Sequence, residues 1–298
     1  MSALPFLIVI PFLLTALSLE AQFQDRLYPF RELTDEMRAR IDLKDGSIED
    51  WLEILGEPTL TGLDFASSSY DPSSYDCRLW LAWHDATDHL FVAVEIVDDS
   101  FVDMEELYGF PLSFPSGDSS VWFLVDGDKS GGTLVEGEGL SMHHAQWYTA
   151  FARTYTNDSN VILVNVSQIA DWVHQLPYAD GGGGIVDSQP ITSVIEFFVT
   201  PFDRLIWDDP EKSEISDLHD GTTIRFALSM QDYDSEEGSD PFSPSWLELF
   251  GPDASYGQNY VFEVDLWAHG ILLGADGGSD GSAVESVAWG RIKASLSE

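Results

Sequence analysis

The residues with the clearest spacing for chemistry lie in the segment DGDKSGG, residues 126–132. Asp126, Asp128 and Ser130 occupy alternate positions, and a glycine comes sixth. Side-chain oxygens at these positions wrap a hard cation in calcium loops, where the glycine permits the turn. Position twelve, where an EF-hand has a bidentate glutamate, is Gly137, so an EF-hand is excluded. The segment is either a calcium-binding loop between strands or a turn in which Asp and Gly satisfy local backbone groups.

Two further acids, Asp98 and Asp99, end the strand-like run that precedes this segment. If the two runs pair, these carboxylates lie near Asp126 and are additional candidate calcium ligands. The acidic loops 232–240 and 274–282 have similar compositions, but they are more typical of solvated turns.

Tryptophan side chains offer a second kind of chemistry, because sugar rings stack their apolar faces on flat aromatic rings. Strand alternation places Val121 and Phe123 on one face and Trp122 on the other. It likewise separates Trp80 from Leu79. The candidate sugar-binding residues are Trp80, Trp122, Trp147, Trp172 and Trp246. Each of them could instead be buried, because loops over a two-layer sandwich bury aromatic residues on both faces.

Signatures of catalysis are missing from the sequence. The seven histidines show no HxH or HExxH spacing, which opposes a zinc hydrolase, and no GxSxG nucleophile motif occurs. Among 52 Asp and Glu residues some carboxylate pair always exists, so a glycoside hydrolase is neither indicated nor excluded. The single cysteine, Cys77, precludes an internal disulfide and is typical of a small buried hydrophobe. We therefore predict a protein that is not an enzyme.

The chain is strongly acidic, with 13 Lys and Arg against 52 Asp and Glu and a formal net charge of −39. This charge repels nucleic acids and anionic membranes. It indicates an acidic surface suited to salty water, divalent-cation binding at particular loops, or both. Because the acids are spread along the whole chain, a solvated surface accounts for most of them.

The amino terminus predicts export. Residues 5–17 form an apolar run without charge, followed by small residues, so residues 1–21 are interpreted as a secretory signal with cleavage after Ser18 or Ala21. The run is short for a membrane span. We expect a secreted, periplasmic or cell-surface protein that does not insert into a membrane once the signal is removed.

The remaining sequence predicts one all-β domain over residues 42–298, preceded by a lead-in at 22–41 in which Thr34 is a candidate helix N-cap. Short β-rich runs alternate with Gly, Pro, Asp and Ser clusters, as in an antiparallel β-sandwich with long acidic loops. Strands are expected near 79–84, 89–97, 119–125, 145–155, 160–166, 192–200, 222–231, 259–265 and 285–296. Long connections are expected at 98–117, 176–190 and 233–245.

Several of these runs, in this order, resemble family 9 carbohydrate-binding modules and the related DOMON-like domains. The similar segments are DGSIEDW (45–51), LAWHDATDHLFVAVEIVDD (81–99), DSSVWFLVD (118–126), IEFFVTPFDRL (195–205), DGTTIRFALSMQDYD (220–234) and the closing WGRIKASL (289–296). The resemblance implies a jelly-roll or immunoglobulin-like β-sandwich, calcium sites, and a sugar held between two aromatic rings. It does not place that aromatic pair in this chain.

The function expected from these observations is a secreted, non-catalytic protein that binds a polysaccharide or glycan on aromatic side chains and is braced by calcium. One alternative is an adhesion or structural surface protein of the same fold without a sugar site. A second alternative is a haem-binding electron-transfer domain, since related sandwiches bind haem through Met, His or Lys and the chain contains Met142, His143 and His144 in succession.

Overall fold

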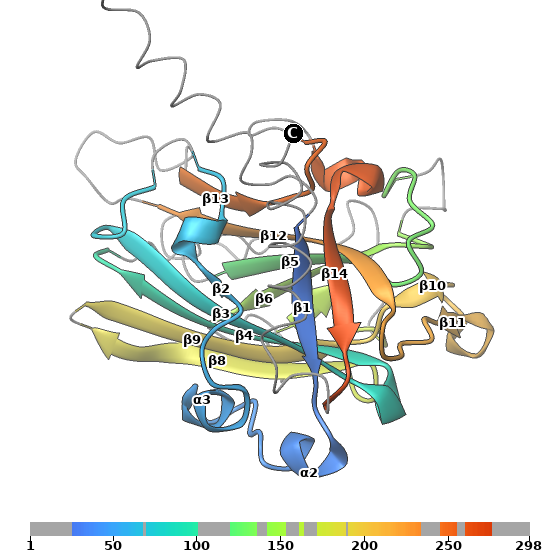
Figure 1. Cartoon of the computed structure of the whole chain (residues 1–298), viewed down its shortest axis with the longest axis horizontal. Coiled ribbons are helices and arrows are strands. Elements are labelled where there is room, and N and C mark those ends of the chain that lie inside the picture. Colours follow the sequence, from blue (N-terminus) through green and yellow to red (C-terminus); the bar gives the residue numbers. More distant parts are fainter. Residues whose placement is uncertain are drawn as a thin grey trace, which may run out of the picture.

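The computed structural model describes residues 26–67, 70–100, 120–135, 142–152, 161–163, 172–188, 190–233, 245–254 and 260–275. Its strands are β1 (Leu27–Glu32), β2 (Leu60–Thr61), β3 (Tyr75–His84), β4 (His89–Asp98), β5 (Ser120–Asp126), β6 (Gln146–Phe151), β7 (Val161–Leu163), β8 (Ala179–Ser188), β9 (Ile191–Val199), β10 (Phe202–Arg204), β11 (Glu214–Ile215), β12 (Thr223–Asp232), β13 (Ser245–Leu249) and β14 (Ala268–Leu273). Its helices are α2 (Asp35–Arg38) and α3 (Glu49–Leu55), with several single 3₁₀ turns (Figure 1).

Within the described ranges, twelve strands form one large sheet in the order β7-β6-β5-β12-β14-β1-β3-β4-β9-β8, with β13 beside β12 and β2 beside β3. Strand β1 pairs in parallel with both β14 and β3, and the other pairings are antiparallel. The prediction of a β-rich fold is confirmed. The expectation of a purely antiparallel sheet is wrong, because the predicted lead-in contains β1, which enters between two strands (Figure 1).

Strand β8 contains the glycine run that the sequence pattern assigned to a connection. A Cβ atom on Gly182 would lie 2.6 Å from the carbonyl oxygen of Leu43, and one on Gly183 would lie 2.8 Å from that of Phe151. Only glycine allows backbone to approach this strand so closely from both sides. Since Phe151 ends β6, the approach brings the end of the sheet formed by β7 and β6 next to β8 at the opposite end, and the sheet curls almost into a barrel.

Other predicted elements differ in detail. The expected strand at 259–265 forms two 3₁₀ turns, in which Glu263 N–H donates to the Tyr260 carbonyl at 3.0 Å and Trp267 N–H to that of Val264 at 3.1 Å. These local bonds replace a strand ladder. The expected strand at 285–296, the signal at 1–21 and the loops 276–282 and 234–240 lie outside the described residues.

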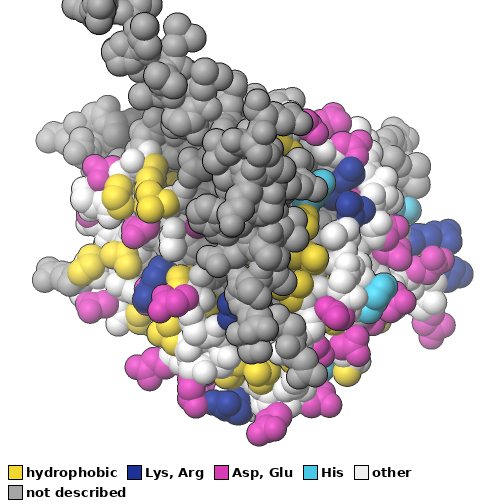
Figure 2. Space-filling view, viewed as in Figure 1, with side chains coloured by type: hydrophobic (Ala, Val, Ile, Leu, Met, Phe, Trp, Pro, Cys, Tyr) yellow, Lys and Arg dark blue, Asp and Glu magenta, His cyan; other side chains and the backbone are white. Residues whose placement is uncertain are grey.

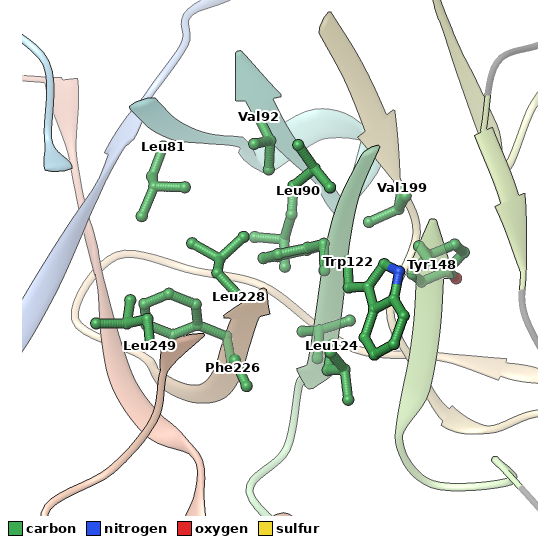
Figure 3. Packing of buried hydrophobic residues seen from close by; sticks show 14 of the residues in the cluster. Leu81, Leu90, Val92, Trp122, Leu124, Tyr148, Val199, Phe226, Leu228 and Leu249 are labelled. Carbon is green, nitrogen blue, oxygen red and sulfur yellow. The ribbon is translucent and has the colours of Figure 1, made fainter. Parts of the chain in front are cut away.

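The main core lies between the curved halves of the sheet. Figure 3 shows part of it, in which Leu81 and Val92 lie across from Phe226 and Leu228. All four side chains are fully buried. This is the face that alternation assigned to the core in β3, β4 and β5, and it includes Val121, Phe123, Val125 and Trp83.

A second, smaller core lies on the other face of β3, β4 and β9, beneath α2 and α3 (Figure 1). Helix α2 begins as predicted, because the Thr34 Oγ1 accepts a hydrogen bond from Met37 N–H at 3.3 Å. The fully buried Trp51 of α3 packs against this face of the sheet. This helical layer covers a face that the sequence pattern left exposed.

On the face that Figure 2 shows, the Asp and Glu side chains of the described residues are spread apart and do not gather at one place. None of the helices in the described ranges is both long enough and apolar enough to cross a membrane.

Candidate functional site

A row of side chains crosses the sheet on the face of β5 opposite Val121, Phe123 and Val125, and its ring, Trp122, belongs to the same buried hydrophobic cluster as those residues. Strand register aligns Thr149 of β6 with Trp122 of β5, Trp122 with Ser229 of β12, and Ser229 with Glu248 of β13. Residues directly opposite each other in antiparallel strands share a face. The row therefore combines one large aromatic ring with hydroxyl and carboxyl groups.

Three tryptophans gather on this face, and we call them the tryptophan cluster: Trp122, Trp147 and Trp246. The ring centroid of Trp122 lies 4.6 Å from that of Trp147 at an interplanar angle of 55°, and 4.9 Å from that of Trp246 at 68°. Trp122 and Trp147 are 8% and 4% exposed, whereas Trp246 is only partly buried. Trp246 therefore presents the cluster to solvent.

The floor around the cluster is polar. Thr149 and Ser229 are fully buried, and neither hydroxyl has a hydrogen-bond partner among the described residues. The carboxamide oxygen of Gln231, which is 2% exposed, accepts a hydrogen bond from the Tyr233 hydroxyl at 2.9 Å. A buried hydroxyl without a partner costs roughly 1–3 kcal/mol, so the described contacts leave two polar groups beside the cluster unsatisfied.

One side of the cluster is closed by the turn that follows β13. Phe262 meets Trp147 edge to face, with centroids 6.5 Å apart. The Phe262 carbonyl accepts from Leu134 N–H at 2.9 Å, and Val264 N–H donates to the Gly132 carbonyl at 2.9 Å. The chain that follows the DGDKSGG segment thus fixes the ring that closes this side.

The other two predicted tryptophans lie elsewhere. Alternation correctly separates Trp80 from the main core, but Trp80 is fully buried beneath the helical layer, and its indole N–H donates to the Gly56 carbonyl at 2.9 Å. It therefore does not line a surface. Trp172 packs against Tyr178 and Phe202 at 4.9 and 5.7 Å, and its indole N–H donates to the Trp207 carbonyl.

The DGDKSGG segment forms a compact turn. The fully buried Asp126 accepts hydrogen bonds from Ser130 N–H at 3.2 Å and Gly131 N–H at 2.9 Å, and Asp128 accepts from Ser130 N–H at 2.9 Å. Burial raises the pKa of Asp126 to about 7, against the Gly131 hydrogen bond and with a further contribution from Asp128. Burial also opposes ionisation of Asp128, but hydrogen bonds from Asp126 and Ser130 outweigh it and lower its pKa.

This arrangement does not by itself fit a calcium ion. The Asp126 oxygens are taken by backbone N–H groups, and the charge of Arg225 lies close enough to act on the Asp126 carboxylate. Among the described residues, no group of three or more His, Cys, Asp and Glu side chains is placed to hold a metal. Calcium binding by this segment stays a prediction.

Asp98 and Asp99 do not join Asp126. Strand β4 pairs with β3 and β9, not with β5, and following the pairings across the sheet shows that β4 and β5 run in opposite directions. Their carboxyl ends therefore lie at opposite ends of the sheet. Asp98 instead accepts from Ser100 N–H at 2.9 Å, and the Ser100 hydroxyl donates to the Tyr233 carbonyl at 3.3 Å, near the end of β12.

The structure also places the residues raised by the haem alternative. Met142 is 1% exposed and belongs to the main core, and the His143 carbonyl accepts a hydrogen bond from Leu205 N–H. The burial of Met142 does not present its sulfur as an axial ligand, and the Nε2 atom of His144 is buried without a hydrogen-bond partner among the described residues.

Sequence reasoning missed Thr149, Ser229 and Gln231, because a hydroxyl or amide in a strand carries no signal of its register. It also missed Glu196, which is fully buried on β9. One Glu196 oxygen accepts a hydrogen bond from the Trp51 indole N–H at 2.7 Å. The only sign in the sequence that Trp51 and Glu196 are important is that each lies in a segment that resembles family 9 modules.

Comparisons with known proteins agree with this architecture. No known family profile matches the sequence, and no curated protein matches it. Among solved structures, the chain is similar to a carbohydrate-binding module of family 9 from Caldicellulosiruptor kristjanssonii, determined in complex with glucose. The two share 13% sequence identity over 83% of this chain and 96% of the module, with a TM-score of 0.51. The chain thus has a fold like that of family 9 carbohydrate-binding modules.

Proposed function

We propose that this protein binds a carbohydrate at the tryptophan cluster and does not transform it chemically. The observation that carries the proposal is the juxtaposition of three tryptophan rings with buried hydroxyls that have no partner in the described structure, Thr149 and Ser229. Sugars need both surfaces, because their C–H faces stack on rings while their hydroxyl groups exchange hydrogen bonds with polar side chains.

Charge narrows the ligand class that fits this site. Glu248 lies in the same cross-strand row as Trp122, and the whole chain carries a formal net charge of −39. A polyanionic glycan would be repelled, and the repulsion would weaken in salt. A neutral glycan is therefore the ligand class that we propose.

The fold supports this proposal, since the similar module from Caldicellulosiruptor kristjanssonii was solved with glucose. Export is compatible with this proposal, because the apolar amino terminus has the composition of a secretory signal. We propose that the protein acts as an exported glycan-binding protein.

Affinity electrophoresis against a panel of neutral and acidic soluble polysaccharides tests the proposal. We expect retardation by at least one neutral polysaccharide. Trp246→Ala should weaken it at least about tenfold, equivalent to about 1.4 kcal/mol. Trp172→Ala is the matched control, because Trp172 is also a partly exposed tryptophan but lies in a separate aromatic group. Equal retardation of both variants and wild type would refute this site, and retardation of wild type by no polysaccharide would refute the function.

A further inference from the structure

The helical layer is fastened to the sheet by two reciprocal tryptophan hydrogen bonds. The indole N–H of Trp51, on α3, donates a hydrogen bond to the carboxyl group of Glu196, on β9, at 2.7 Å. In the opposite direction, the indole N–H of Trp80, on β3, donates to the carbonyl of Gly56, the C-cap residue of α3, at 2.9 Å. Both tryptophan residues are fully buried, with 0% of their surface exposed to solvent. The first of these bonds depends on a residue that can change its charge.

Glu196 is enclosed on every side. It is 0% exposed, and its register neighbours are Ala93 of β4 and Gly182 of β8. A Cβ on Gly182 would lie 2.6 Å from the Leu43 carbonyl oxygen, so the chain before α3 closes directly over this part of the sheet. The second Glu196 oxygen is buried and has no hydrogen-bond partner among the described residues.

The charges that act most strongly on Glu196 from the helical layer are all acidic: Asp50 of α3, and Asp45 and Asp42 of the chain before it. Asp50 is itself held in place, because its two oxygens accept from the N–H groups of Asp42 at 3.0 Å and Trp51 at 2.8 Å. An ionised Glu196 would therefore be repelled by these like charges, with one buried oxygen that has no hydrogen-bond partner in the described structure.

Nearby basic groups on the packed elements contact partners other than Glu196. Lys44 Nζ lies 2.7 Å from an Asp180 oxygen on β8, and Arg78 of β3 binds Glu95 of β4, with Nε donating at 2.8 Å. On α2, Arg38 lies over the Phe91 ring at 5.1 Å from its centroid. None of these provides Glu196 with a counter-ion in the described contacts.

We propose that α3 and the chain from Asp42 to Gly56 form a proton-dependent cover, docked on the sheet while Glu196 is protonated and released from it when Glu196 is ionised. The neutral acid still accepts the Trp51 hydrogen bond, so docking does not require charge. Ionisation makes the enclosed site unfavourable, and opening the cover gives the carboxylate water. The main core lies on the other face of the sheet and is not disturbed by this opening.

The direction of the pH effect follows from linkage. Burial raises the pKa of Glu196 to about 8, partly opposed by the Trp51 hydrogen bond and reinforced by Asp50, Asp45 and Asp42. In the open form the carboxyl titrates near its ordinary value of about 4.3. Between these values the closed form holds a proton that the open form has lost, so opening becomes easier as pH rises.

Hydrogen–deuterium exchange of the full-length protein from pH 5 to pH 9 tests this proposal, with labelling times scaled to the intrinsic exchange rate at each pH. For peptides covering α3, the opening constant should rise by up to about tenfold per pH unit and level off above about pH 8. Peptides covering β5 should keep their protection. Simultaneous loss of protection in both regions would mean global unfolding and would overturn the proposal, as would a flat response of α3.

Glu196→Gln should abolish this pH dependence, because the amide keeps an acceptor for Trp51 and cannot ionise. Glu53→Gln is the matched control, since Glu53 lies on α3 with a side chain that is 73% exposed, and its α3 peptides should respond as wild type does. Trp51→Phe should open more at every pH but retain the pH slope, because the carboxyl remains. A slope that survives in Glu196→Gln would assign the titration to another group. Should that variant fail to fold, the wild-type and Trp51→Phe slopes still decide the proposal.

Discussion

Trp122 and Trp246 meet edge to face across a strand that separates them. They belong to β5 and β13, which flank β12, and strands two apart in a sheet lie roughly 9.5 Å from each other. Their ring centroids are nevertheless only 4.9 Å apart. The rings therefore lean toward each other over β12, where Trp122 is directly opposite Ser229. The short side chain of Ser229 leaves room for the two rings to meet above it. The ring contact therefore depends on one of the polar residues beneath the cluster.

The polar floor predicts an unusual separation of stability from binding. Thr149→Val should leave the free energy of unfolding unchanged or raise it, because it removes a buried hydroxyl that has no partner in the described structure. The same variant should weaken binding of the retarding polysaccharide. Denaturant unfolding and affinity electrophoresis measure the two effects.

Thr200→Val serves as the control for that variant. Thr200 is also buried, at 1% exposure, but its hydroxyl donates to the Tyr178 carbonyl at 2.8 Å. Its loss should lower the free energy of unfolding by about 1 kcal/mol without affecting binding. If Thr149→Val were destabilising and fully competent in binding, the hydroxyl would have a structural role only.

A second prediction concerns Asp126 and pH. The folded state raises the pKa of Asp126 from 3.8 to about 7, so between these values the folded protein holds a proton that the unfolded chain has lost. The contribution of Asp126 to stability is therefore present below about pH 4 and is lost as pH rises to about 7. Asp126→Asn should remove this contribution to the slope of unfolding free energy against pH. Asp253→Asn, at an exposed acid, should retain the wild-type slope.

Calcium gives a third prediction. If the DGDKSGG segment or another acidic loop binds calcium only when folded, chelation at constant ionic strength should lower the melting temperature, since a ligand at a hundred times its Kd adds about 2.7 kcal/mol. Combined Asp126→Asn and Asp128→Asn substitution should remove the response if this segment is the site. An identical melting temperature with and without chelator would end the calcium proposal.

Salt supplies a fourth prediction. With a formal charge of −39 spread over the surface, raising sodium chloride from about 0.01 to about 0.1 M shortens the Debye length from about 30 to about 10 Å. The melting temperature should rise over this range, because repulsion within the folded protein is screened. Choline chloride should act equally if screening is the cause. A response to one salt alone would indicate specific ion binding.

Some features of this fold follow from the local sequence, and others depend on contacts between distant parts of the chain. Alternation correctly placed Trp122 and Trp80 opposite their core neighbours, because side-chain direction in a strand follows from backbone geometry. It could not tell that α3 covers Trp80, since that depends on Trp51 finding Glu196, 145 positions away along the chain. Alternation alone could not predict the tryptophan cluster, because the cluster also depends on the register of β5, β6, β12 and β13, which cannot be inferred from the sequence pattern.

Strand direction and close approach were equally out of reach. Asp98 and Asp126 both end strands, but whether two strand ends meet depends on the path of the chain between them. The glycine run resembled a turn because glycine is usually depleted from strands. In β8 glycine is required because backbone from two other parts of the chain, at Leu43 and Phe151, approaches the strand on its two sides. Such an approach is a property of the tertiary structure and not of the local sequence.

If a neutral sugar contacts the tryptophan cluster, the side-chain indole N–H signals of ¹⁵N-labelled protein should report that contact ring by ring. Each tryptophan gives its own signal, which single substitutions assign. Addition of the retarding neutral oligosaccharide should shift the signals of Trp122, Trp147 and Trp246, while those of the fully buried Trp51 and Trp267 stay in place. Shifts confined to Trp172 and Trp207, or no shift at all at saturating sugar, would show that the sugar does not bind at the tryptophan cluster.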